Sequence, residues 1–171
     1  EYWKALLFYE KALEIHEKTL PPNHPSLAIS YDNIGLAYNN IGEYSKALSS
    51  HEKALEFFQK TLPSNHPDLA ISYNSIGLVY EKMGEYSKAL SSLEKALEIQ
   101  EKTLPSNHPD LATSYNNISK VYYNMKNYSE AVSYLEHALD IFQRALPLTH
   151  PKIQNIKAGI KFVKEIMKNI Q

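Results

Sequence analysis

Residues 43–67 have the sequence EYSKALSSHEKALEFFQKTLPSNHP, and residues 85–109 have the sequence EYSKALSSLEKALEIQEKTLPSNHP. The two stretches are identical at 21 of 25 positions and lie 42 residues apart. The Asn-His-Pro that ends both also occurs at 23–25, and Thr-His-Pro follows at 149–151. A period kept this closely over 171 residues indicates about four copies of one structural unit, each packed only on its neighbours.

Each unit is expected to contain two helices. The nine prolines all fall in four short clusters, at 21–25, 63–67, 105–109 and 147–151. Proline is excluded from helix interiors but tolerated in the first turn, so these clusters separate helical segments. The intervals between them are too long for one ordinary helix. Inside two intervals, Gly42 and Gly84 follow an amphipathic stretch and suit a left-handed helix end.

The spacing of apolar residues by three and four positions supports this division. We expect the first helix of each unit, helix A, at about 26–41, 68–83 and 110–125. We expect the second, helix B, at about 44–61, 86–103 and 128–145. Gly35 and Gly77 lie in the middle of helix A, where glycine costs about 1 kcal/mol relative to alanine. The close approach of helix B is the expected reason for these glycines.

The two ends of the chain depart from the full unit. Residues 1–22 correspond to helix B without its helix A, so we expect the array to extend further; alternatively, this helix ends it. Residues 150–171 form one capping helix, on which Lys157, Lys161 and Lys164 face water where the next helix B would lie. A basic binding patch is the less favoured alternative for these lysines. The expected organisation is a single array over 1–171, with full units at 26–63, 68–105 and 110–147.

The residues at the packing positions resemble the tetratricopeptide repeat pattern. These residues are Tyr31, Ile34, Gly35 and Tyr38 on helix A and Tyr44, Ala47 and Ala54 on helix B. The usual repeat has 34 residues, whereas a 42-residue unit with a linker such as LPSNHPDLA is similar to the kinesin light chain type. The resemblance implies an all-α fold: a right-handed superhelical solenoid of antiparallel helix pairs, with about eight helices. It also implies a scaffold for protein–protein interaction.

Charge and hydropathy exclude several classes of partner. The chain has 18 Lys and Arg against 19 Asp and Glu, so its net charge of −1 favours neither nucleic acid nor an anionic membrane. The 13 tyrosines are expected at packing positions and not as a stacking surface for bases. No apolar run is long enough to span a membrane, and no signal-like segment is visible. We therefore expect a cytoplasmic protein.

No pattern of catalytic or metal-binding residues is apparent. The chain contains no Cys, which excludes disulfides, thiolate metal sites and a Cys nucleophile. A histidine recurs in each proline cluster, but 42 residues separate successive copies. Ligands must lie about 2 Å from one metal ion, so these histidines cannot share one. We expect neither an enzyme nor a cofactor.

A groove is the expected binding site. Helix pairs stacked with a constant rotation produce a concave face lined by helix A, and Asn is frequent at the positions that helix B does not cover. Amide groups both donate and accept, so they suit the backbone of an extended peptide or a partner helix. Alternatively, these amides only hydrogen-bond between neighbouring helices. The candidate peptide-binding residues are Asn33, Leu36, Asn40, Asn74, Leu78, Lys82, Asn116, Asn117, Lys120 and Tyr123.

Two ligand types known for this repeat fit the groove poorly. Chaperone-binding tetratricopeptide domains hold a C-terminal carboxylate with Lys, Asn and Arg, but Asp32 stands at the first Lys position, and Ile71 and Thr113 stand at another. Kinesin light chains bind aromatic-acidic peptides with help from basic residues, for which only Lys82 and Lys120 are candidates. An alternative function is a structural spacer or a self-association element that uses the open first helix.

Overall fold

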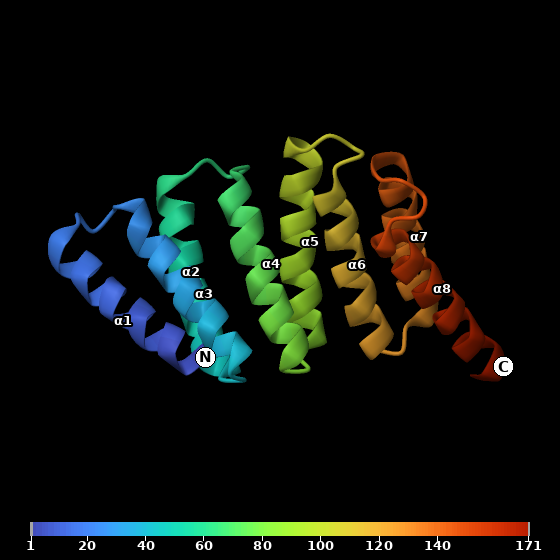
Figure 1. Ribbon diagram of the computed structural model, residues 1–171, viewed down its shortest axis with the longest axis horizontal. Coiled ribbons are helices and arrows are strands. Elements are labelled where there is room, and N and C mark those ends of the chain that lie inside the picture. The colour runs from blue at the N-terminus through green and yellow to red at the C-terminus, as the bar shows by residue number, and fades with distance from the viewer. Residues whose placement is uncertain (1, 171) are drawn as a thin grey trace.

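The structure is a computed structural model and describes residues 2–170. Residues 1 and 171, at the ends of the expected first and last helices, lie outside the described residues. The described chain forms eight α-helices that follow one another along the long axis of the molecule (Figure 1). They are α1 (Tyr2–Thr19), α2 (Pro25–Asn40), α3 (Tyr44–Thr61), α4 (Pro67–Lys82), α5 (Tyr86–Thr103), α6 (Pro109–Asn124), α7 (Tyr128–Ala145) and α8 (Pro151–Ile170). This architecture confirms the all-α solenoid of paired helices.

The helices of the three full units match the expected ones to within one residue, whereas α1 ends at Thr19, before the expected bound of 22. Helix A of each full unit begins one residue earlier than expected, at proline, and ends one residue earlier. Proline suits this first position because its fixed φ is helical and its missing N–H would have no partner there. In Figure 1 the proline linkers lie along one edge of the array, and the tight turns lie along the opposite edge.

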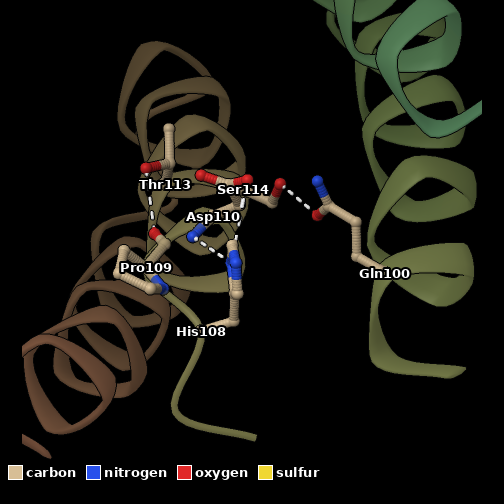
Figure 2. A network of polar contacts seen from close by, with 6 residues as sticks. All are labelled: Gln100, His108, Pro109, Asp110, Thr113 and Ser114. Atoms are coloured by element: carbon tan, nitrogen blue, oxygen red, sulfur yellow. Dashed lines mark hydrogen bonds and ion pairs between the residues drawn. The ribbon is translucent and has the colours of Figure 1, made fainter. Parts of the chain in front are cut away.

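The histidine before each proline caps the helix that follows. The ring Nδ1 of His108 accepts a hydrogen bond from the backbone N–H of Asp110 at 3.2 Å (Figure 2). His24, His66 and His150 make the same 3.2 Å bond to the residue two positions on. Each ring therefore satisfies one of the N–H groups that a helix start leaves unpaired. Ser, Thr, Asp and Asn are the usual capping residues, so sequence preferences alone do not indicate this role for histidine.

The tight turns between helix A and helix B require a left-handed backbone. Gly42 and Gly84 have φ values of 83° and 77°, as their position in the sequence predicts. In the third unit Lys126 takes this conformation, with a φ of 62°. Glycine adopts positive φ without steric cost, whereas a residue with a Cβ does not. The third turn is therefore under more strain than the other two.

Alanine and glycine allow the paired helices to approach closely. Ala47, Ala89 and Ala131 on helix B are fully buried. A Cβ built on Gly35 would lie 2.7 Å from the ring of His51, and one built on Gly77 would lie 2.7 Å from Leu93. The close approach of helix B thus explains both mid-helix glycines, as expected, and the contacting side chains are those of His51 and Leu93.

The buried apolar side chains of the described residues form three clusters that follow one another along the array, because each helix packs mainly on the next one in the chain. At the C-terminal end α8 buries Ile153, Ile156 and Val163 against the preceding pair. Lys157 and Lys161 on its other side are exposed. None of the helices between residues 2 and 170 is both long and apolar enough to cross a membrane.

Candidate functional site

The predicted binding residues lie along one face formed by α2, α4 and α6. Leu36, Asn40, Lys82 and Lys120 are exposed. The half-buried members are Asn33, Asn74, Leu78, Asn116 and Tyr123. Two further apolar side chains on this face, Ile29 and Ile71, are 54% and 58% exposed. Exposed apolar groups thus alternate with amides along helix A, an arrangement that favours contact with another polypeptide.

One pair of these amides connects two helices. Asn117 is buried, and its Nδ2 donates a hydrogen bond to Oδ1 of Asn74 at 3.1 Å, which joins α6 to α4. Farther along the same two helices, Asn124 donates to Glu81 at 2.7 Å. The interhelical role considered for the Asn residues therefore accounts for the Asn117–Asn74 pair. Of the predicted amides, those of Asn33, Asn40 and Asn116 lie outside this pair and are at least partly exposed.

The first groove pocket lies where α2, α3 and α4 meet and has a volume of about 290 Å³. The apolar part of its lining is formed by Ile29, Leu36, Phe58 and Ile71. Polar groups also line it, from Asp32, Asn33, His51, Asp68 and Ser75. Two predicted residues, Asn33 and Leu36, come together here.

A polar pair, of which one member is buried, contributes to this first groove pocket. His51 on α3 is 1% exposed, and its Nδ1 lies 2.9 Å from Oδ1 of Asp32 on α2. Sequence reasoning missed this pair. The signal was present, because His51 stands where later units have Leu93 and Leu135, and Asp32 stands where they have Asn74 and Asn116. Both positions change in the same unit, but only the structure shows that the two side chains touch.

The second groove pocket lies at the other end of the face, between α6, α7 and α8. It has a volume of about 390 Å³ and is lined by Asn116, Lys120, Leu135, Lys152 and Gly159, among others. An adjoining hollow of about 260 Å³ extends it to Tyr123 and Phe162, whose ring centroids are 6.2 Å apart. Three predicted residues, Asn116, Lys120 and Tyr123, come together here.

Residues of α8 complete the second groove pocket, whereas the sequence favoured a capping role for that helix, with a basic binding patch as the alternative. Phe162 is 55% exposed and occupies the position of Leu36 and Leu78 in earlier units. Alignment by the 42-residue period could have identified it. The remaining predicted residues, Asn40, Asn74, Leu78, Lys82 and Asn117, line neither groove pocket.

Tyrosines occupy the other side of helix A and connect it to the preceding helix B. Tyr31 donates a hydrogen bond to Glu17 at 2.8 Å, and Tyr115 donates one to Glu101 at 2.7 Å. The ammonium group of Lys53 lies over the ring of Tyr31, 5.2 Å from its centroid. These contacts hold neighbouring helices together, in agreement with the expected packing role.

No three His, Asp or Glu side chains between residues 3 and 170 are grouped so that they could hold a metal ion. The four capping histidines lie in four successive linkers.

Comparison with known proteins agrees with this geometry. The family model described as tetratricopeptide repeat matches residues 1–60, 34–102 and 68–144. No curated protein matches the chain significantly. Among solved structures, the nearly identical TPR-like repeats of a candidate kinesin light chain from Podosopora anserina are 27% identical, with a TM-score of 0.85. The similarity covers 98% of this chain and 80% of that one.

Two more distant structures share the fold. BtubC (BKLC) from P. vanneervenii is 21% identical with a TM-score of 0.86, over 96% of this chain and 65% of that one. The apo form of RapI is 19% identical with a TM-score of 0.82, over 99% of this chain and 59% of that one. The repeat length, the family model and the structural similarity agree, and the chain belongs to the tetratricopeptide repeat family, with repeats of the kinesin light chain type.

Proposed function

We propose that this chain is a protein–protein interaction scaffold that binds an extended peptide segment or a partner helix along the helix A face. The observation that carries the proposal is the presence of two pockets on that same face, one between α2 and α4 and one between α6 and α8. The proposed role is binding without catalysis.

The chemistry of the face supports a polypeptide ligand. Exposed apolar side chains, Ile29, Leu36, Ile71 and Phe162, lie near or in the two pockets and would contact apolar side chains of the ligand. Asn33 and Asn116 carry amides that both donate and accept hydrogen bonds, as the backbone of a peptide requires. Membership of a repeat family that commonly acts as a scaffold supports the same proposal.

The proposal can be tested with peptides selected from a random phage-displayed library on the chain of residues 1–171. The test variants are Leu36→Arg in the first groove pocket and Phe162→Arg in the second. Each adds a bulky charge at an exposed apolar site, so the melting temperature should change little while peptide affinity falls. Leu148→Arg is the matched control, because Leu148 is 62% exposed and lies in a linker. Peptides that bind both groove variants as tightly as the wild-type chain would contradict the proposal.

A second candidate function is self-association through α1. Trp3, Leu7, Phe8 and Ile15 on this helix are 63%, 52%, 68% and 59% exposed. A patch of large apolar side chains on one helix favours an interface between copies. Light scattering over a range of concentrations should then show a mass increase that is lost in a Trp3→Glu, Phe8→Glu double variant. A constant monomer mass for the wild-type chain would exclude this candidate.

A further inference from the structure

We propose that the first groove pocket binds a lysine or arginine side chain of the partner segment, with the carboxylate of Asp32 as its counter-ion. The inference rests on the proposed peptide-binding function and adds the chemistry of the ligand at one end of the groove.

The geometry places a carboxylate in the lining of a mostly apolar pocket. The Asp32 side chain is 19% exposed, and one of its oxygens, Oδ1, lies 2.9 Å from Nδ1 of His51. For Oδ2 no hydrogen bond occurs among the described residues. Asp32 therefore has an orientation set by a buried partner and a second oxygen available to a ligand. A carboxylate held in this way binds a cation with less loss of side-chain entropy than a mobile surface carboxylate does.

Packing alone does not explain the Asp32–His51 pair. The second unit has Asn74 and Leu93 at these positions, and the third has Asn116 and Leu135. Both of those units form the same helix pair, with Leu93 and Leu135 buried. Placing an imidazole where leucine packs, and a carboxylate where the other units have a neutral amide, carries a desolvation cost. A binding role at this pocket gives a reason for a polar pair that the fold itself does not need.

The charges around the first groove pocket favour a cation. No Lys or Arg lines it, whereas a second carboxylate, that of Asp68, does. The ion-pair contact of Asp68 is with His66, at 3.7 Å. The second groove pocket has the opposite character, because Lys120 and Lys152 line it. The groove therefore has an acidic end and a basic end, and the acidic end selects against carboxylates.

The walls of the first groove pocket fit the stem of a long basic side chain. Ile29 on α2 and Ile71 on α4 both line the pocket and are more than half exposed. Lysine and arginine carry three or four methylene groups behind their charge, and these groups favour apolar surroundings. Asn33 and Ser75 supply neutral oxygen acceptors for the N–H groups that Asp32 does not bind. The pocket thus matches an amphipathic cation better than a neutral apolar side chain.

The test compares the wild-type chain with an Asp32→Asn, His51→Leu double variant. Both substitutions introduce the residues of the second unit, so the variant should fold; its circular dichroism melt checks this, and Asp32→Asn alone is the backup. Phage-displayed random peptides are selected on each chain. Peptides from the wild-type chain should share one Lys or Arg position, and this preference should disappear with the double variant. Asp110→Asn is the matched control, since it removes the same charge from a carboxylate outside both pockets.

The decisive measurement uses the selected peptides in synthetic form, with the basic residue kept or replaced by glutamine. Loss of the charge should weaken binding to the wild-type chain by about tenfold or more and should have little effect on the double variant. Absence of a shared basic position, or an equal loss on both chains, would overturn the inference. If binding still depends on Leu36 and Phe162, the peptide groove stands and only the basic specificity fails. If binding depends on neither, the proposed function fails as well.

Discussion

The hydroxyl group of Ser72 is fully buried and has no hydrogen-bond partner among the described residues. The equivalent hydroxyls are paired: Ser30 Oγ lies 2.9 Å from Nδ1 of His16, and Ser114 donates to Gln100 at 2.5 Å (Figure 2). In the second unit, the position of His16 and Gln100 is occupied by Phe58, whose side chain has no polar atom to pair with Ser72.

We expect Ser72→Ala to increase the free energy of unfolding by about 1 kcal/mol, because a buried unpaired hydroxyl is costly. Urea titration monitored by circular dichroism measures this change. Ser114→Ala is the control and should have the opposite effect, since it leaves the Gln100 amide oxygen without its donor. A loss of stability in the Ser72→Ala protein would show that this hydroxyl has a partner in solution.

Gly77 lies inside α4 and Gly159 inside α8, and replacing each by alanine should change the stability of the protein in opposite directions. In Gly77→Ala the new methyl group would meet Leu93 at 2.7 Å, so we expect a loss of about 1–3 kcal/mol. In Gly159→Ala the nearest side-chain atom is Cδ1 of Leu135 at 3.7 Å, an ordinary contact. Here alanine should add up to about 1 kcal/mol through its higher helix propensity. Thermal melts of both variants test this contrast, and destabilisation of equal size would disprove it.

At the scale of the elements, the turn between α6 and α7 is the least favourable of the three tight turns. Lys126 has a φ of 62° at the position that Gly42 and Gly84 occupy in the other units. We expect Lys126→Gly to stabilise the protein by about 1 kcal/mol, because the left-handed conformation costs a residue with a Cβ about that much.

The measurement is the urea midpoint of the Lys126→Gly protein against that of the wild-type chain. Gly84→Ala provides the reverse change in the preceding turn, where φ is 77° and nothing lies within 4 Å of the added Cβ. It should destabilise through backbone strain alone. If Lys126→Gly also lowers the midpoint, the greater freedom of glycine in the unfolded chain outweighs the relieved strain.

At the scale of the whole molecule, hydrogen bonds from tyrosine to glutamate between successive helix pairs should make the stability of the protein fall at alkaline pH. Burial, and then the hydrogen bond to Glu17, raises the pKa of Tyr31 from 10.0 to about 12. Burial and the bond to Glu101 raise the pKa of Tyr115 to about 12 in the same way. Between pH 10 and 12 the unfolded chain therefore loses protons that the folded chain keeps, so stability falls as pH rises through this window.

We expect the melting temperature to fall between pH 10 and 12, and to fall less steeply in a Tyr31→Phe, Tyr115→Phe double variant. The variant should be less stable at neutral pH, because it lacks two hydrogen bonds, but it has two fewer groups that titrate. Equal slopes for the two proteins would show that these tyrosines do not keep their protons in the folded state.

The sequence by itself determined the number, order and bounds of the helices. Proline clusters, turn glycines and the spacing of apolar residues act within a few positions of one another, so they can be recognised without knowing the tertiary structure. The same local signals indicated the helix A face and most of the residues on it. The capping histidines are an exception, because histidine is not among the usual capping residues and the contact of its ring with the helix start is visible only in the structure.

Only the tertiary structure decided how the residues of that face are used. Asn117 and Asn74 lie 43 positions apart and pair between helices, and Asp32 and His51 lie 19 apart and meet in a pocket. The second groove pocket requires Phe162 of α8 to lie beside Tyr123 of α6. These contacts depend on how each helix is rotated and how closely it packs on the next one. The shapes of the side chains across each interface, such as His51 against Gly35, set that rotation and distance. The 42-residue period repeats the backbone, but packing between helices determines which side chains reach one another.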